Sequence, residues 1–62
     1  MEFIAKTDEE IIPLKASCLY TARVEFELIN KKGEVQLILD DGISLEGEEL
    51  GQYCRENKIY YF

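Results

Sequence analysis

The chain has 62 residues, with thirteen acids, seven bases and no histidine, and its net charge at neutral pH is −6. A chain this short forms one domain, residues 1–62, whose small core often needs a disulfide, a metal or a second chain for stability. The negative charge argues against direct binding to nucleic acid or to an anionic membrane, because phosphates have to be neutralised by bases.

The cysteine content and the first residues of the chain bear on its location. Two cysteines, Cys18 and Cys54, are too few for the disulfide framework of a small secreted domain, although one disulfide is arithmetically allowed. The N-terminal residues lack the basic and apolar regions of a signal peptide, and no apolar run is long enough to span a bilayer. We therefore expect a cytoplasmic protein with two buried, reduced thiols.

The N-terminal residues predict a strand, Glu2–Lys6, followed by a turn. Thr7 and Glu10 have the spacing of a capping box, in which the two side chains satisfy backbone N–H groups at the start of a helical turn. Because Pro13 cannot continue a helix, we expect a single turn here and then an extended segment, 13–15.

The middle of the chain predicts a β-hairpin. Residues 18–29 alternate between apolar and polar side chains, which is typical of a strand with one buried face, and residues 34–40 alternate in the same way. Gly33 supplies the left-handed conformation that a tight connection needs. Pairing Ile29 with Glu34 across a four-residue loop lets every inward residue of one strand meet an inward residue of the other.

The first strand of this hairpin is longer than a domain of this size is wide. We expect it to bend near Thr21 and Ala22, so that its first half pairs with the N-terminal strand. A long bending strand also favours the alternative fold, a small barrel of the SH3-like or OB-like type.

Residues 40–42 are a turn signal, and after them the apolar side chains recur with the period of a helix. This pattern predicts an amphipathic helix of about three turns that ends near Asn57. Two glycines on its inner stripe reduce helix propensity by about 1 kcal/mol each. We attribute them to a close approach of the helix to the sheet. The inner stripe consists of Gly47, Leu50, Gly51 and Cys54.

The last four residues, 59–62, predict a final strand that is apolar on both faces. Such a strand is either central, with neighbouring side chains closing over its outer face, or part of an interface, where Tyr and Phe are enriched. Apolar residues on the outer faces of the other predicted strands, among them Ile29, favour the interface. The predicted oligomer interface consists of Leu19, Ile38, Ile59 and Tyr61.

These elements predict an α+β fold. We expect a small, curved, mainly antiparallel sheet of four strands with one helix packed on it, in the order β-β-β-α-β.

Acidic residues concentrate in the second half of the chain, where residues 34–56 hold seven acids and one base, Arg55. Acids in the first turn of a helix complement its dipole and need no further function, but this does not account for acids that precede the helix. The functional interpretation is a carboxylate surface for a basic partner. The predicted partner-binding residues are Asp40, Asp41, Glu46, Glu48 and Glu49.

The chain offers little for catalysis or metal binding. It has no histidine, P-loop, GxGxxG or CxxC motif, and its acids lack the spacing of an EF-hand loop. A cysteine nucleophile would have no histidine as its base. One sheet layer and one helix leave little volume for a pocket that shifts a pKa. We expect no enzymatic activity, no cofactor and no metal.

The sequence therefore predicts a small non-enzymatic protein-binding module whose partner is a protein with a basic surface. Its size and acidity are typical of small inhibitors from phages or mobile elements, some of which present carboxylates where a target expects phosphates. The alternative is a self-assembling structural or accessory subunit, a homo-oligomer joined by the C-terminal aromatic residues. A third interpretation is a small-ligand site in a crevice between two subunits.

Overall fold

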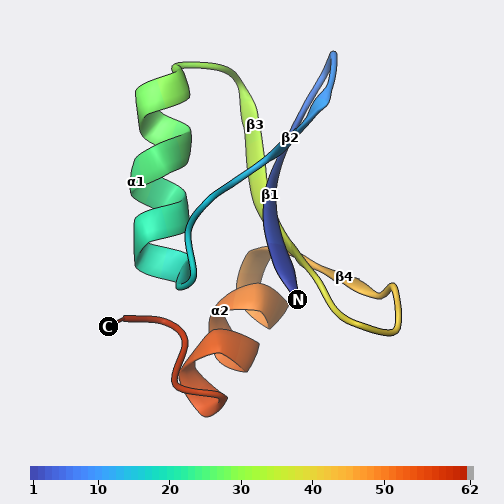
Figure 1. The fold of residues 1–62 in the computed structure, drawn as a ribbon, viewed down its shortest axis with the longest axis vertical. Helices are drawn as coiled ribbons and strands as arrows, with labels where there is room; N and C mark the ends of the chain where they lie inside the picture. The colour runs from blue at the N-terminus through green and yellow to red at the C-terminus, as the bar shows by residue number, and fades with distance from the viewer. Residues whose placement is uncertain (62) are drawn as a thin grey trace.

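The computed structural model describes residues 1–61, which form two helices and one four-stranded antiparallel sheet (Figure 1). The predicted α+β class and the four-stranded antiparallel sheet are confirmed. The predicted order with a single helix is wrong, because the described elements follow the order β-β-α-β-β-α. They are β1 Glu2–Thr7, β2 Ile11–Pro13, α1 Leu19–Ile29, β3 Gly33–Ile38, β4 Ser44–Leu45 and α2 Gly47–Glu56.

The sheet has the order β2-β1-β3-β4, with β2 and β4 at its edges. It is open, so the alternative of a closed barrel is wrong for the described residues. The N-terminal strand is confirmed, but its long partner is β3, with Phe3 opposite Leu37 and Ala5 opposite Val35. The turn expected after Thr7 is present, but it connects two strands and is not a helical turn, and the Thr7 N–H bonds to the Glu10 backbone carbonyl at 2.9 Å and not to the Glu10 side chain. It joins β1 to β2, and the Thr7 hydroxyl oxygen accepts the N–H groups of residues 9 and 10 at 3.3 and 3.0 Å.

Residues 19–29 form helix α1 and not a strand, so the predicted hairpin and its register are wrong. The segment satisfies two periods at once. Its even positions alternate as in a strand, while Leu19, Ala22, Phe26 and Ile29 recur as on one side of a helix, where they pack into or against the core. The length of the segment decides between a strand and a helix. A straight strand of twelve residues would extend about 40 Å, whereas the domain measures 30 × 24 × 19 Å.

The connection from α1 to β3 depends on a different residue from the one expected. Asn30 adopts the left-handed conformation (φ 59°, ψ 47°) and ends the helix, with its N–H bonded to the Glu27 carbonyl at 3.1 Å. Gly33 is required for space, since a Cβ there would overlap the carbonyl oxygen of Lys6 and lie 3.0 Å from the Thr7 Cα.

The C-terminal segment 59–61 forms no strand, and Phe62 lies outside the described residues. Carbonyl groups of the segment 59–61 instead accept hydrogen bonds from the first turn of α1. The Leu19 N–H bonds to Ile59 at 2.8 Å, and the Tyr20 N–H bonds to Tyr60 at 2.9 Å. Because the first N–H groups of a helix have no partner within the helix, this segment acts as a backbone cap.

Helix α2 is confirmed close to its predicted bounds, and its inner stripe packs on the sheet through Leu50 and Cys54. We call the sheet face that both helices cover the inner face; it carries Phe3, Ala5, Val35 and Leu37. Figure 1 shows α1 alongside the strands and α2 near the N-terminal end of β1.

Two expectations about α2 and the thiols have different outcomes. Both cysteines are buried thiols, as expected, and burial raises the pKa of the Cys54 thiol. The close approach expected at Gly47 and Gly51 is wrong, since a Cβ at either position would meet no atom within 4 Å; Gly47 instead adopts a positive φ of 58°. Neither α1 nor α2 is long and apolar enough to cross a membrane, and residues 1–61 contain no further helix.

We predict opposite effects for two glycine-to-alanine substitutions. Gly33→Ala should lower the free energy of unfolding by about 1–3 kcal/mol, because the new methyl group has no space beside β1. Gly51→Ala should raise it by about 1 kcal/mol, because alanine favours the helix and meets no obstacle. Urea unfolding of both variants measures this. A loss in Gly51→Ala comparable to that in Gly33→Ala would contradict the assignment.

Candidate functional site

The sheet has a second face that the helices do not cover. Side chains alternate along β1 and β3, and the core residues of α1 and α2 pack with those of the inner face. Within residues 1–61, the other face therefore lies outside this core. We call it the outer sheet face; it carries Glu2, Ile4, Lys6, Ile11, Pro13, Glu34, Gln36, Ile38 and Ser44, and Glu46 at the end of β4.

Side chains at the centre of the outer sheet face are buried, whereas those on its edge strand β2 are exposed. Ile4 and Gln36 lie opposite each other on the two central strands, and only 6% and 7% of their surfaces are exposed. On the edge strand β2, 61% of Ile11 is exposed, and Pro13 is exposed as well. Exposed apolar atoms therefore lie on the same face as charged side chains.

Two carboxylates meet on this face around the amide of Gln36. Its Nε2 donates to Glu34 Oε1 at 3.1 Å and to Glu46 Oε2 at 2.8 Å. The hydrogen bond and the negative charge of Glu34 raise the pKa of Glu46, whereas hydrogen bonds from Glu46 and Gln36 lower the pKa of Glu34. Lys6, opposite Glu34 on β1, favours the ionised form of both. The pair is thus a concentration of negative charge that attracts a cation.

The structure distributes the five predicted acids among different roles. Asp40 accepts a hydrogen bond from the N-terminal ammonium of Met1 at 2.7 Å, which lowers the pKa of this carboxyl. Asp41 accepts the Ile43 N–H at 3.1 Å and so stabilises its own turn. Only Glu46 joins the carboxylate pair. The remaining two, Glu48 and Glu49, are exposed in the first turn of α2.

Sequence reasoning missed Glu34 as the partner of Glu46. The two are far apart in the chain, and the antiparallel pairing of β3 with β4 brings them together. The sequence does contain one indication that Glu34 belongs to the site. The alternation of residues 34–40 places Glu34 and Gln36 outward on the same side of the strand, next to each other on one face.

The four residues of the predicted oligomer interface lie in different places. Leu19 is fully buried in the core, because residues 18–29 are not a strand with an outer face. Ile59 is half-buried against the core, and Ile38 is half-buried on the outer sheet face. Tyr61 is 64% exposed.

Helix α1 leaves a row of apolar side chains on its outer side. Tyr20, Val24 and Leu28 follow one another at intervals of four, and 53%, 42% and 81% of their surfaces are exposed. The ring of Tyr61 lies 5.4 Å from that of Tyr20, centroid to centroid. We call these four residues the exposed α1 stripe.

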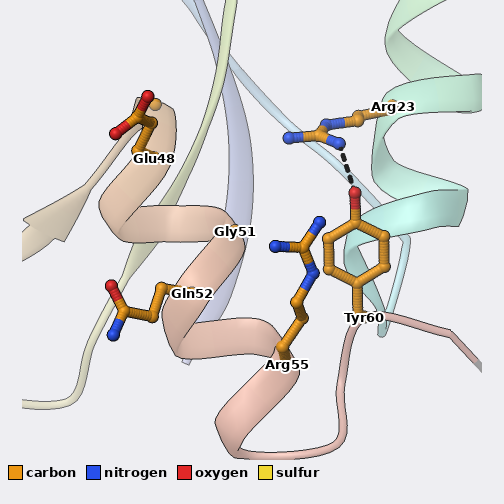
Figure 2. A pocket seen from close by; sticks show the side chains of 7 residues that line it. Arg23, Glu48, Gly51, Gln52, Arg55 and Tyr60 are labelled. Atoms are coloured by element: carbon orange, nitrogen blue, oxygen red, sulfur yellow. Dashed lines mark hydrogen bonds between the residues drawn. The ribbon is translucent and has the colours of Figure 1, made fainter.

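A cleft of about 660 Å³ lies between the two helices (Figure 2). It is lined by Arg23 from α1, by one side of α2 and by Tyr60 from the C-terminal segment. Among the described residues, no group of three or more Cys, Asp or Glu side chains is arranged to hold a metal ion.

Comparison with protein-family models, with curated proteins and with solved structures gives no match for this chain.

We predict that Glu34→Gln lowers the pKa of Glu46 toward the ordinary value of a glutamate. The substitution removes the carboxylate that raises the pKa of Glu46, first through its hydrogen bond and then through its negative charge. An NMR pH titration of the Glu46 side-chain carboxyl carbon measures the change. Glu9→Gln, in the turn after β1, removes the same charge elsewhere and should leave the titration unaltered. An unchanged Glu46 pKa in Glu34→Gln would show that the two carboxylates do not interact.

Proposed function

We propose that this chain is a small protein-binding module without enzymatic activity, and that its outer sheet face docks on a basic surface of a partner protein. The observation that carries the proposal is the pair Glu34 and Glu46, joined by Gln36 on a sheet face that neither helix covers.

Charge supports a basic partner. Two carboxylates that share one amide repel each other, and a Lys or Arg side chain that contacts both would relieve this repulsion. The outer sheet face carries three acids, Glu2, Glu34 and Glu46, and one base, Lys6. The negative net charge of the whole chain adds a long-range attraction that would speed encounter with a basic protein.

Shape and composition support docking on this face. Protein interfaces combine apolar contact with hydrogen-bonded polar groups at the rim. Ile11, Pro13 and Ile38 provide exposed or half-exposed apolar surface, and the carboxylate pair provides the charged contact. An inhibitor that occupies a phosphate-binding surface is one form that such a module can take; origin from a phage or mobile element stays a prediction.

Affinity capture from a lysate tests the proposal when matched variants are used. Glu34→Gln/Glu46→Gln removes the pair, and Asp8→Asn/Glu9→Gln removes two exposed charges from the β1–β2 turn. A true partner should elute early in a salt gradient, remain bound to the control, and bind the first variant on the order of tenfold more weakly. Binding should also weaken as the pH falls through the pKa of Glu46, because protonation removes a negative charge. A protein that both variants retain equally would contradict the proposal.

A second candidate function is self-association through the exposed α1 stripe. Apolar side chains at intervals of four on one helix are typical of helix-mediated docking, and a chain of this size gains stability by pairing. Tyr61, which the sequence predicts as an interface residue, belongs to this stripe, where its ring contacts that of Tyr20. A second copy that presents the same stripe would bury these side chains.

Sedimentation measures this candidate directly. We expect the protein to associate at high concentration and Leu28→Gln to shift it toward the monomer, because Leu28 is the most exposed side chain of the stripe. Ile11→Gln, on the outer sheet face, is the matched control and should associate like the unaltered chain. A protein that remains monomeric at high concentration excludes the second candidate.

A further inference from the structure

The cleft between α1 and α2 collects positive charge in an acidic chain. The sequence contains two arginines, Arg23 and Arg55, and both line this cleft although they come from different helices. Figure 2 shows both guanidinium groups beside the ring of Tyr60, on the side of the cleft away from the start of α2.

Tyr60 orients both arginines. The Arg23 Nη1 donates a hydrogen bond to the Tyr60 hydroxyl oxygen at 2.8 Å. The guanidinium carbons of Arg23 and Arg55 lie 5.6 and 4.9 Å from the centroid of the Tyr60 ring, which is within cation–π distance. Tyr60 itself is anchored, because its side chain packs against the core and its backbone carbonyl accepts the Tyr20 N–H. The two cations are therefore oriented before any ligand arrives, which reduces the entropy cost of binding.

Neither arginine is held in an ion pair, since the ion pairs among the described residues are Met1 with Asp40 and Lys31 with Glu10. Glu27, one turn along α1 from Arg23, lines neighbouring hollows with it but not this cleft. Glu48 is the one acid that lines the cleft, and Figure 2 shows its carboxylate directed away from both guanidinium groups. Two cations beside one ring repel each other, and an anion between them would convert this repulsion into attraction.

We propose that this cleft binds a phosphate-type dianion, either free or as the monoester group of a small molecule. A phosphate monoester carries close to two negative charges at neutral pH and three strong acceptor oxygens, which matches two guanidinium groups. A single carboxylate carries half that charge. Gly47 and Gly51 leave the α2 side open, since a Cβ at either would meet no atom within 4 Å. The volume of about 660 Å³ exceeds that of a phosphate and leaves space for the rest of a small molecule.

The cleft and the proposed protein-binding face are different surfaces with opposite charge. Failure to bind phosphate would therefore leave the proposed function unaffected, and loss of the protein partner would leave the phosphate site unaffected.

Titration by NMR, with amide and arginine Nε–H signals as the readout, tests the site. Inorganic phosphate and phenyl phosphate are the two phosphate probes. Sodium chloride at equal ionic strength and acetate are the comparison arms. We expect saturable shifts at Arg23, Arg55 and Gly51 with phosphate, and only weak, unsaturated shifts with acetate or chloride. Tighter binding of phenyl phosphate would identify a monoester as the preferred form, weaker binding would identify the free ion, and equal affinities would show that the site recognises the phosphate group alone.

Variants separate a built site from general charge. Arg55→Gln should weaken phosphate binding on the order of tenfold, and Arg55→Lys should weaken it less, because lysine keeps the charge but not the planar fork. Lys32→Gln removes the same charge from an exposed position in the α1–β3 connection and should bind like the unaltered chain. Arg23→Gln also breaks the bond to Tyr60, so Arg55→Gln is the decisive variant. The proposal is overturned if Arg55→Gln binds phosphate as tightly as the unaltered chain, or if Arg55→Gln and Lys32→Gln lose the same affinity. It is also overturned if chloride produces the same NMR shifts as phosphate.

Discussion

The arrangement of the two helices depends on the backbone cap that residues 59 and 60 place on the first turn of α1. The N-cap position holds Cys18 instead of the Ser, Thr, Asp or Asn that usually accepts these N–H groups. Carbonyl groups from the far end of the chain take over that role. Because the same segment follows α2 directly, the cap also fixes α1 relative to α2. It thereby places Tyr60 beside both arginines and Tyr61 against Tyr20.

The parts of the fold with one clear period were predictable, and the parts decided by distant contacts were not. The alternation of β3 and the helical stripe of α2 each agree with one structure only, and both predictions are confirmed. Residues 18–29 satisfy both periods, and the limited width of the domain selects the helix. The C-terminal residues have the composition of a strand, but the carbonyl groups of Ile59 and Tyr60 accept hydrogen bonds from α1. Of the candidate site, Glu46 was predictable from local acidity; Glu34 and the pairing of the two arginines required strand pairing and helix packing.

A sheet with both helices on one face separates the charges of this small domain. The outer sheet face gathers Glu34 and Glu46 around an amide, and the cleft on the helical side gathers Arg23 and Arg55 around a tyrosine. In each case an uncharged side chain, Gln36 or Tyr60, orients two like charges. The domain therefore presents an anionic and a cationic surface despite its strongly negative net charge.

The backbone cap on α1 also has a consequence for how the chain acquires its structure during synthesis. The N–H of Tyr20 finds its partner only when residue 60, about forty positions later, has left the ribosome. We therefore expect α1 to fray on the nascent chain and to become firm only after α2 has emerged. We expect this late closure to make folding concerted, without a stable intermediate in which α1 is already formed.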